Sequence, residues 1–328
     1  MTVSIKDVAR VAGVAPSTVS RALGKGPVSD EVRAQVLAAV RATGYRPNLA
    51  ARRLRSRQTG TVGLILADIR NPFFTAVSRA VEDAAYREGI RVILCNTDED
   101  PEREAMYLGL MAEERVSGVI LAPTRRGEER LGLAAPLGFP VVLLDRAELR
   151  GHDAVVLDNA RAVGDLVDHL VLQGYRHIGG LFGATSATGA ERRAGYLAAM
   201  ARHGLPAEAR TAPPSVASGI AAIGGWLDEA ARPEALVVSN GLFLEAAVKA
   251  ARERGIAIPS GLALAGFDDE TWTSLVEPGI TVIRQPVEAM GTEAMALLTA
   301  RIARPDAPAR TVTLAGRFVP RGSTAPRQ

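Results

Sequence analysis

The chain has 328 residues, of which 47% are apolar and 23% are charged, the composition of a soluble globular protein with two or three domains. A single cysteine, Cys95, excludes an intramolecular disulfide framework and a cysteine-cluster zinc site, and no apolar run is long enough to span a bilayer. Residues 1–60 hold eleven Lys/Arg and three acids, a net charge of +8, whereas the remainder has −5, so the first sixty residues alone are suited to a polyanion.

Three short helices are expected within the first 46 residues. Ser4 and Asp7 have the spacing of a capping box, which marks the start of the first helix, and Gly13 suits its left-handed end. A second helix is predicted over residues 16–23 because it opens with a proline, which fits a first turn. A third helix is predicted over residues 29–44 from its serine cap, its apolar stripe and its final glycine.

The outer face of the second helix carries Ser17, Thr18 and Arg21. In a helix-turn-helix, the second helix enters the major groove with its first residues at the base edges. Arginine offers a guanidinium fork to guanine, and hydroxyls reach bases or phosphates. Two short helices can also be plain scaffold, and a basic segment can be a solvated tail, but apolar periodicity together with a basic outer face favours DNA binding.

The segments Ser4–Ala9, Ala12–Val14 and Ser17–Leu23 closely resemble the headpiece of the lac-repressor (LacI/GalR) family, and Gly44–Leu54 resembles its hinge. One departure is Ala15, where the family usually has serine; the missing cap costs about 1 kcal/mol unless the fold compensates. The resemblance implies a set of DNA-contacting residues: Pro16, Ser17, Thr18, Arg21, Asn48, Ala51, Leu54 and Arg55.

The hinge segment Asn48–Arg55 is long enough for only about two helical turns. An isolated helix needs ~12–15 residues to be stable in water. We therefore expect it to be disordered in the free protein and to fold on DNA. The resemblance implies that Leu54 wedges into the minor groove at the operator centre, where the two hinges of a dimer would kink the duplex. The alternative is a flexible basic linker in which Leu54 has no partner.

From residue 61 the pattern changes to short apolar runs alternating with amphipathic, alanine-rich stretches, which predicts an α/β fold of doubly wound parallel sheets. No internal repeat is obvious. The predicted organisation is a three-helix headpiece (1–46), a hinge helix and linker (47–60), and an effector-binding domain (61–328) with one lobe at about 61–157 and 286–328 and the other at about 158–283.

This body resembles the family's two-lobed effector domain, which has a periplasmic-binding-protein-like fold. The matching segments are Asn71–Phe74, Val141–Arg146, Asp158–Asn159, Ala190–Tyr196, Gly266–Asp269 and Thr281–Pro286. Ligands of such folds lie in the cleft at the carboxyl ends of strands. The expected effector contacts are Phe73, Asp145, Arg146, Arg192, Asn240 and Asp268.

The functional interpretation of these contacts has alternatives. Phe73 can be a core residue and Asp268 a turn cap. Two departures from the family pattern alter the pocket. Ser239-Asn240-Gly241 stands where the family usually has an aspartate after the strand, so that Asn240 is the candidate substitute, and the position of the aromatic that caps many family pockets falls near Pro214. A sugar or sugar derivative remains the first expectation for the effector.

Two alternative functions are an oxidoreductase and a periplasmic sugar-binding protein. An oxidoreductase is not supported, because Gly179–Gly183 lacks the spacing of a dinucleotide loop and the four histidines show no nucleophile or metal motif. A periplasmic sugar-binding protein would need a signal peptide and no basic headpiece. We therefore predict no enzyme, no catalytic or metal site and no cofactor. The predicted function is a cytoplasmic, homodimeric repressor that binds double-stranded operator DNA, responds to a small-molecule effector and contacts no membrane.

Overall fold

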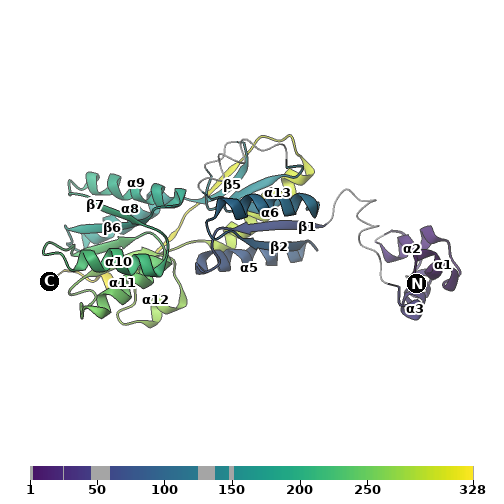
Figure 1. Ribbon diagram of the computed structural model, residues 1–328, viewed down its shortest axis with the longest axis horizontal. Helices are drawn as coiled ribbons and strands as arrows, with labels where there is room; N and C mark the ends of the chain where they lie inside the picture. Colours follow the sequence, from purple (N-terminus) through teal and green to yellow (C-terminus); the bar gives the residue numbers. More distant parts are fainter. Residues whose placement is uncertain (1–2, 25, 46–59, 125–136, 148–150, 328) are drawn as a thin grey trace. The chain divides into compact units, whose positions relative to one another are not determined.

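The computed structural model describes residues 3–24, 26–45, 60–124, 137–147 and 151–327, which form two compact units, 1–59 and 60–328 (Figure 1). In the described part of the chain, no helix is both long and apolar enough to cross a membrane. Each unit has its own hydrophobic core.

The first unit consists of α1 (Ile5–Val11), α2 (Pro16–Leu23) and α3 (Asp30–Thr43). The Ser4 N–H donates to the Asp7 carboxylate over 3.0 Å, as the capping-box spacing predicted. The three helices pack around a small core of Val8, Val19 and Val36, all fully buried. Ala15 is the N-cap residue of α2 and provides no side-chain cap, so the first turn of this helix depends on the proline that opens it.

The second unit contains two six-stranded sheets with the same strand order, one in each lobe. The first sheet runs β11 (Thr311–Leu314), β5 (Asp153–Leu157), β4 (Val141–Leu144), β3 (Val119–Leu121), β1 (Thr61–Leu66), β2 (Arg91–Asn96). The second runs β12 (Arg317–Val319), β10 (Thr281–Arg284), β9 (Ala263–Phe267), β8 (Ala235–Val238), β6 (Ile178–Gly183), β7 (Glu208–Ala212). All neighbouring strands are parallel except β10 and β12, so the predicted doubly wound α/β fold is confirmed.

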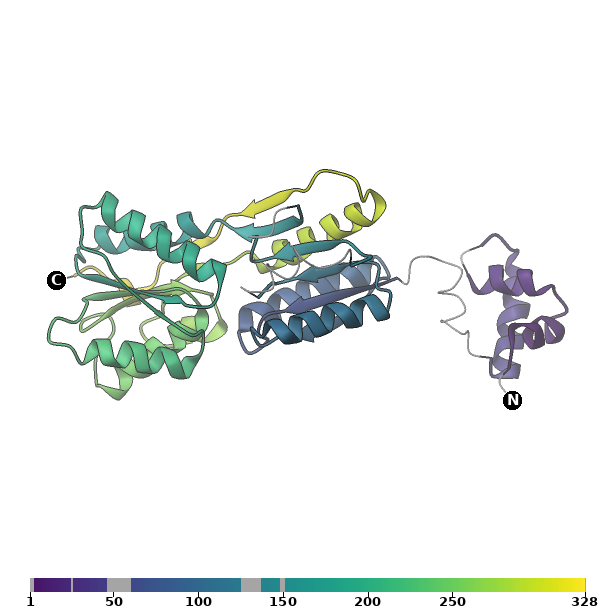
Figure 2. The ribbon, with the colours of Figure 1, turned by 45° about the horizontal axis from the view of Figure 1, so that its top comes forward.

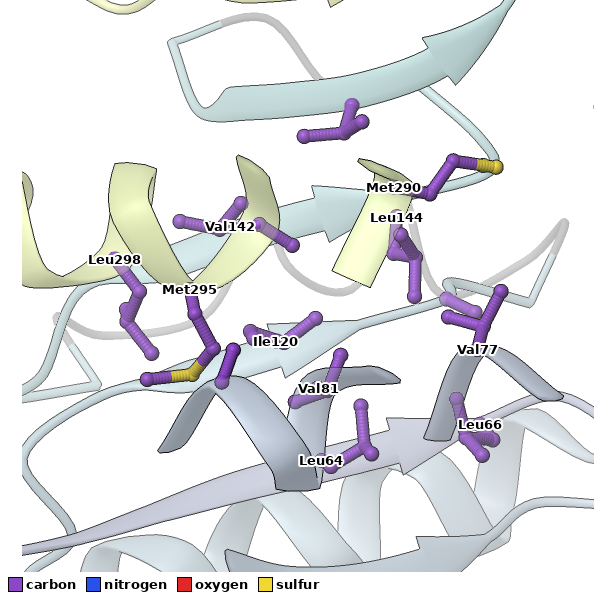
Figure 3. Packing of buried hydrophobic residues seen from close by; sticks show 14 of the residues in the cluster. Leu64, Leu66, Val77, Val81, Ile120, Val142, Leu144, Met290, Met295 and Leu298 are labelled. Atoms are coloured by element: carbon purple, nitrogen blue, oxygen red, sulfur yellow. The ribbon is translucent and has the colours of Figure 1, made fainter. Parts of the chain in front are cut away.

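Helices cover both faces of each sheet. Those of the first lobe are α5 (Pro72–Arg87), α6 (Pro101–Glu113) and α13 (Val287–Ala303); those of the second are α8 (Asn159–Leu172), α9 (Ala187–Arg202), α10 (Val216–Leu227), α11 (Gly241–Glu253) and α12 (Thr271–Leu275). Figure 3 shows α5 and α13 packing on the first sheet through side chains that include Val77, Val81, Met295 and Leu298. These buried layers hold the strand ends in fixed positions.

The path of the C-terminal segment differs from the sequence prediction. We expected residues 286–328 to return to the first lobe. This holds for α13 and β11, but β12 pairs antiparallel with β10 of the second sheet (Figure 2). The following helical turn, η1 (Gly322–Thr324), belongs to the second lobe as well: the Ser323 hydroxyl accepts from Thr281 N and donates to the Leu264 carbonyl. The chain therefore crosses between the lobes three times, near residues 158, 285 and 315.

Candidate functional site

The outer face of α2 presents the side chains expected to reach DNA. Pro16, Ser17 and Arg21 are exposed and Thr18 is half-buried, while Val19 and Ala22 on the opposite face are in the core. The Arg21 Nη2 donates to the Thr18 hydroxyl over 3.2 Å, which keeps the guanidinium along the helix. The other predicted DNA contacts, Asn48, Ala51, Leu54 and Arg55, lie outside the described residues.

A cleft lies between the two lobes, at the carboxyl ends of their strands. It contains about 520 Å³ outside protein atoms, counting its open mouth, and residues of both lobes line it. Its wall includes all six residues that the sequence analysis singled out: Phe73, Asp145, Arg146, Arg192, Asn240 and Asp268. The location of this cleft, rather than its size, is typical of ligand sites in two-lobed α/β folds.

Arg192, in the second turn of α9, lines the cleft from the second lobe and is 4% exposed. Its Nε donates to Asn159 Oδ1 (2.7 Å), its Nη1 to the Ser239 carbonyl (2.5 Å) and its Nη2 to Gln285 Oε1 (3.3 Å). The guanidinium carbon lies 3.9 Å from the ring centroid of Phe267. Burial lowers the pKa of Arg192, and neighbouring carboxylates act in the opposite direction. The contacts fix the orientation of a cation inside the cleft.

Asp145 and Asp268 occupy equivalent positions in the two lobes. Each follows the fourth strand of its lobe, has a positive φ (69° and 76°), and donates its N–H to the adjacent strand, at Val155 O (2.9 Å) and Ile283 O (3.0 Å). A positive φ in a non-glycine residue is strained, and such strain is often found where a side chain must point into a site. The same local geometry thus aims one carboxylate from each lobe at the cleft.

The two carboxylates differ in their partners. Asp268 accepts from Gln285 Nε2 (2.7 Å) and from the N–H of Gly241 (2.8 Å), which also makes it the turn-stabilising residue that the alternative interpretation predicted. Among the described residues Asp145 accepts no hydrogen bond, and its ion-pair partner is Arg146, whose Nε lies 3.6 Å from Oδ2. Burial raises the pKa of Asp145 to about 6, an effect that Arg146 partly opposes. Asp145 is therefore the carboxylate that is available to a ligand.

Phe73 and Asn240 serve the fold as well as the cleft. Phe73 is buried in the first-lobe core and packs edge-to-face on Phe74, with ring centroids 5.1 Å apart. Asn240 is the N-cap of α11, and its side-chain oxygen accepts from the Phe243 N–H over 2.8 Å. Both residues line the cavity; Phe73 also has the core role that was its alternative interpretation, and Asn240 has a capping role that the sequence did not predict.

The comparisons with known proteins agree with this arrangement. Residues 4–48 match the family model described as bacterial regulatory proteins, lacI family, and residues 167–324 match the periplasmic binding protein-like domain. The HTH-type transcriptional regulator PtxS of Pseudomonas plecoglossicida is 36% identical, over 98% of this chain and 96% of that protein. The chain belongs to the lacI family of bacterial regulatory proteins.

Other relatives within the lacI family extend this result. The ribose operon repressor of Escherichia coli K12 is 31% identical over 98% of this chain and 99% of its own length. The solved structure described as a transcriptional regulator CelR–cellobiose complex is 27% identical, covers 98% of this chain and 99% of its own, and has a TM-score of 0.73. The chain is thus a DNA-binding transcriptional regulator of the lacI family and not an enzyme.

Sequence reasoning missed two acids that line the cleft of this lacI-family member. Glu99 accepts hydrogen bonds from both terminal nitrogens of Arg146: Nη1 donates to Oε2 (2.9 Å) and Nη2 donates to Oε1 (2.5 Å). Arg146 Nη1 also donates to the Pro123 carbonyl (2.7 Å). Asp68 follows β1 and pairs with Arg70. Both acids lie just beyond the carboxyl end of a strand, where ligand sites of such folds form, so their positions in the sequence could have identified them.

Proposed function

We propose that the protein is a repressor that acts in the cytoplasm as a homodimer and whose operator affinity is switched by a sugar-like effector bound in the cleft. The observation that carries the proposal is the convergence of six residues from both lobes on one cavity, in a chain that also has a helix-turn-helix. A ligand that contacts both lobes favours one angle between them, and it acts through its differential affinity for the two states.

Selection of DNA from a randomised duplex pool by the full-length protein tests the DNA-binding half of this proposal. We expect enrichment of a pseudo-palindrome, because two recognition helices of a symmetric dimer read two half-sites. A thermal-shift panel of sugars then tests the effector half, since a ligand of the native state raises the melting temperature. Recovery of random sequence would contradict the proposed operator binding, and the absence of a shift with any sugar would contradict the proposed effector.

The charges of the cleft favour a neutral, hydroxyl-rich effector. Four acids line it, Asp68, Glu99, Asp145 and Asp268, against two arginines. Both arginines already donate to protein oxygens, whereas the Asp145 carboxylate is open to donors. Hydroxyl groups donate to such an acceptor, and an anionic group would be repelled. The printed names of two relatives, a ribose operon repressor and a cellobiose complex, are consistent with sugars.

The pKa of Asp145 predicts how effector binding depends on pH. A hydroxyl donor favours the ionised carboxylate, so binding releases a proton below a pH of about 6 and affinity rises with pH until it levels off above that value. Calorimetric titration with the sugar found in the panel, between pH 5 and 8, should show this rise in the wild type. Asp145→Asn should bind about tenfold more weakly at pH 8, because a hydrogen bond to a charged acceptor is stronger, and should lack the pH dependence. An unchanged pH profile in the variant would refute the role of Asp145.

The hinge provides a second prediction, from sequence alone. Leu54→Ala removes the side chain proposed to wedge into the minor groove, so operator affinity should fall by about tenfold or more, whereas affinity for random duplex, which depends on phosphate contacts, should change little. Fluorescence anisotropy with both duplexes measures the two losses. Equal losses would show that Leu54 does not act at the operator centre.

We propose that a second copy of the chain binds at an exposed edge of the first lobe. β2 is the edge strand of its sheet, and Leu94 on it is 47% exposed, while Met106 and Leu110 on the following α6 are 58% and 38% exposed. Open apolar edges are normally covered in native proteins. Leu94→Arg should therefore weaken the dimer by about tenfold or more, because it places an unpaired charge in the interface.

Sedimentation equilibrium compares this variant with a matched substitution elsewhere. Leu172, at the end of α8 in the second lobe, is 82% exposed, so Leu172→Arg introduces the same charge away from the β2 edge. We expect Leu172→Arg to remain a dimer and Leu94→Arg to shift toward monomer. A dimer unaffected by Leu94→Arg would place the interface on another surface.

A further inference from the structure

An arginine of the third headpiece helix is bonded to the end of the recognition helix. Arg33, half-buried in the first turn of α3, donates Nη1 to the Ala22 carbonyl (2.6 Å) and the Gly24 carbonyl (3.2 Å), and Nη2 to the Gly26 carbonyl (3.1 Å). The last carbonyls of a helix have no partner within the helix, and a cation is favoured at that end. One guanidinium thus joins the last turn of α2 to the loop that follows it.

The same loop lies against the base of Arg21. A Cβ placed on Gly26 would lie 3.1 Å from both Cβ and Cγ of Arg21 and 3.3 Å from its Cα. These contacts are tighter than ordinary van der Waals separations, so the backbone of Gly26 occupies the space beside the stem of Arg21. Arg21 is held from its other end by the Thr18 hydroxyl, at 3.2 Å from Nη2. Its long side chain is therefore confined at both ends before DNA arrives.

We propose that Arg33 and Gly26 are positioning residues for base recognition: Arg33 holds the loop, and the Gly26 backbone in turn holds the Arg21 side chain at the angle from which it reads a base. The inference rests on the proposed sequence-specific reading of DNA by Arg21. Bidentate recognition of a base requires the guanidinium in one orientation, so a small displacement of its stem weakens discrimination more than attraction to phosphates. Preorganisation of this kind is how a supporting shell sets the specificity of a site.

A purely structural role for Arg33 makes a different prediction. If the three hydrogen bonds only stabilised the headpiece, their loss would reduce binding to all DNA in proportion to the unfolded fraction, and preferences at every base position would keep their ratios. If they position Arg21, the preference at one base pair of each half-site would weaken while the remaining positions kept theirs. Base-by-base preference therefore separates the two roles.

The experiment is selection from a randomised duplex pool with the full-length protein and five variants, of which Arg21→Ala identifies the base pair that depends on Arg21. Arg33→Met removes the donors and keeps an apolar stem, Arg33→Lys keeps the charge, and Gly26→Ala adds the Cβ that presses on Arg21. Arg41→Met is the matched control, because Arg41 is an exposed residue of the same helix and its loss removes the same charge. Thermal unfolding and affinity for random duplex are measured on each protein.

We expect Arg33→Met and Gly26→Ala to lose about tenfold preference at a single base pair per half-site, the same one that Arg21→Ala affects, with smaller loss in Arg33→Lys. Arg41→Met should keep the full pattern. A uniform loss at all positions, or an unchanged pattern in Arg33→Met and Gly26→Ala, would overturn the proposal. Failure of the wild type to enrich any sequence is a distinct result, which would overturn the proposed DNA reading itself.

Discussion

Arg21→Ala should abolish most of the discrimination between operator and random DNA. Arg21 is exposed on α2 and is the arginine proposed to read a base, and a bidentate contact to a base contributes about 1–3 kcal/mol of discrimination per half-site. Two half-sites of a dimer would then lose about 2–6 kcal/mol, or at least about thirtyfold in operator affinity. Affinity for random duplex should fall much less, because only one of many positive charges per protomer is removed.

A matched variant on the first helix isolates the contribution of position from that of charge. Arg10 is also an exposed arginine of the headpiece, but it lies on α1 and pairs with Asp7. Anisotropy titrations of Arg10→Ala and Arg21→Ala at two salt concentrations should show a small loss on both duplexes for the former and a large operator-specific loss for the latter. Similar losses in the two variants would contradict a base-reading role for Arg21.

Arg192→Met should abolish the response to effector and destabilise the second unit. The substitution leaves the Asn159 and Gln285 side-chain oxygens and the Ser239 carbonyl without their buried donor, and it removes a cation that faces Asp145 and Asp268. Removing one partner from such a buried polar cluster costs about 3–5 kcal/mol. Urea denaturation measures the free energy of unfolding, and thermal shift with the effector measures binding.

The next residue on the same helix supplies the control. Arg193 is exposed, so Arg193→Met removes one arginine from α9 without touching the cleft. This variant should retain wild-type stability and the effector-induced shift. If Arg193→Met lost the response as fully as Arg192→Met, or if Arg192→Met still responded to the effector, the cleft would not be the effector site.

Much of the fold followed from local sequence signals. The first two headpiece helices were predicted by Ser4 with Asp7 and by the proline that opens α2, and the parallel strands by the alternation of apolar runs with alanine-rich stretches. These signals can be found in the sequence because capping, backbone restriction and periodicity act over a few residues. The residues of the cleft wall followed from the resemblance to the lacI family, together with the rule that ligand sites form at the carboxyl ends of parallel strands.

Features that depend on long-range pairing were not predicted. Glu99 and Arg146 are 47 positions apart, and nothing local marks them as partners. The equivalence of Asp145 and Asp268 was hidden because the two lobes share strand order without an evident sequence repeat. The return of β12 to the second lobe depends on its pairing with β10, and a strand of three residues is too short for its pairing partner to be predicted from its sequence.

The central claim is that occupancy of the cleft controls DNA binding, and it predicts a reciprocal coupling. Operator affinity is measured by anisotropy with and without a saturating concentration of the sugar found in the thermal-shift panel, and sugar affinity is measured by calorimetry with and without operator. Linkage requires the two ratios to be equal, and we expect a factor of about 5–150. A factor of one in the wild-type protein, with both ligands bound independently, would contradict the account.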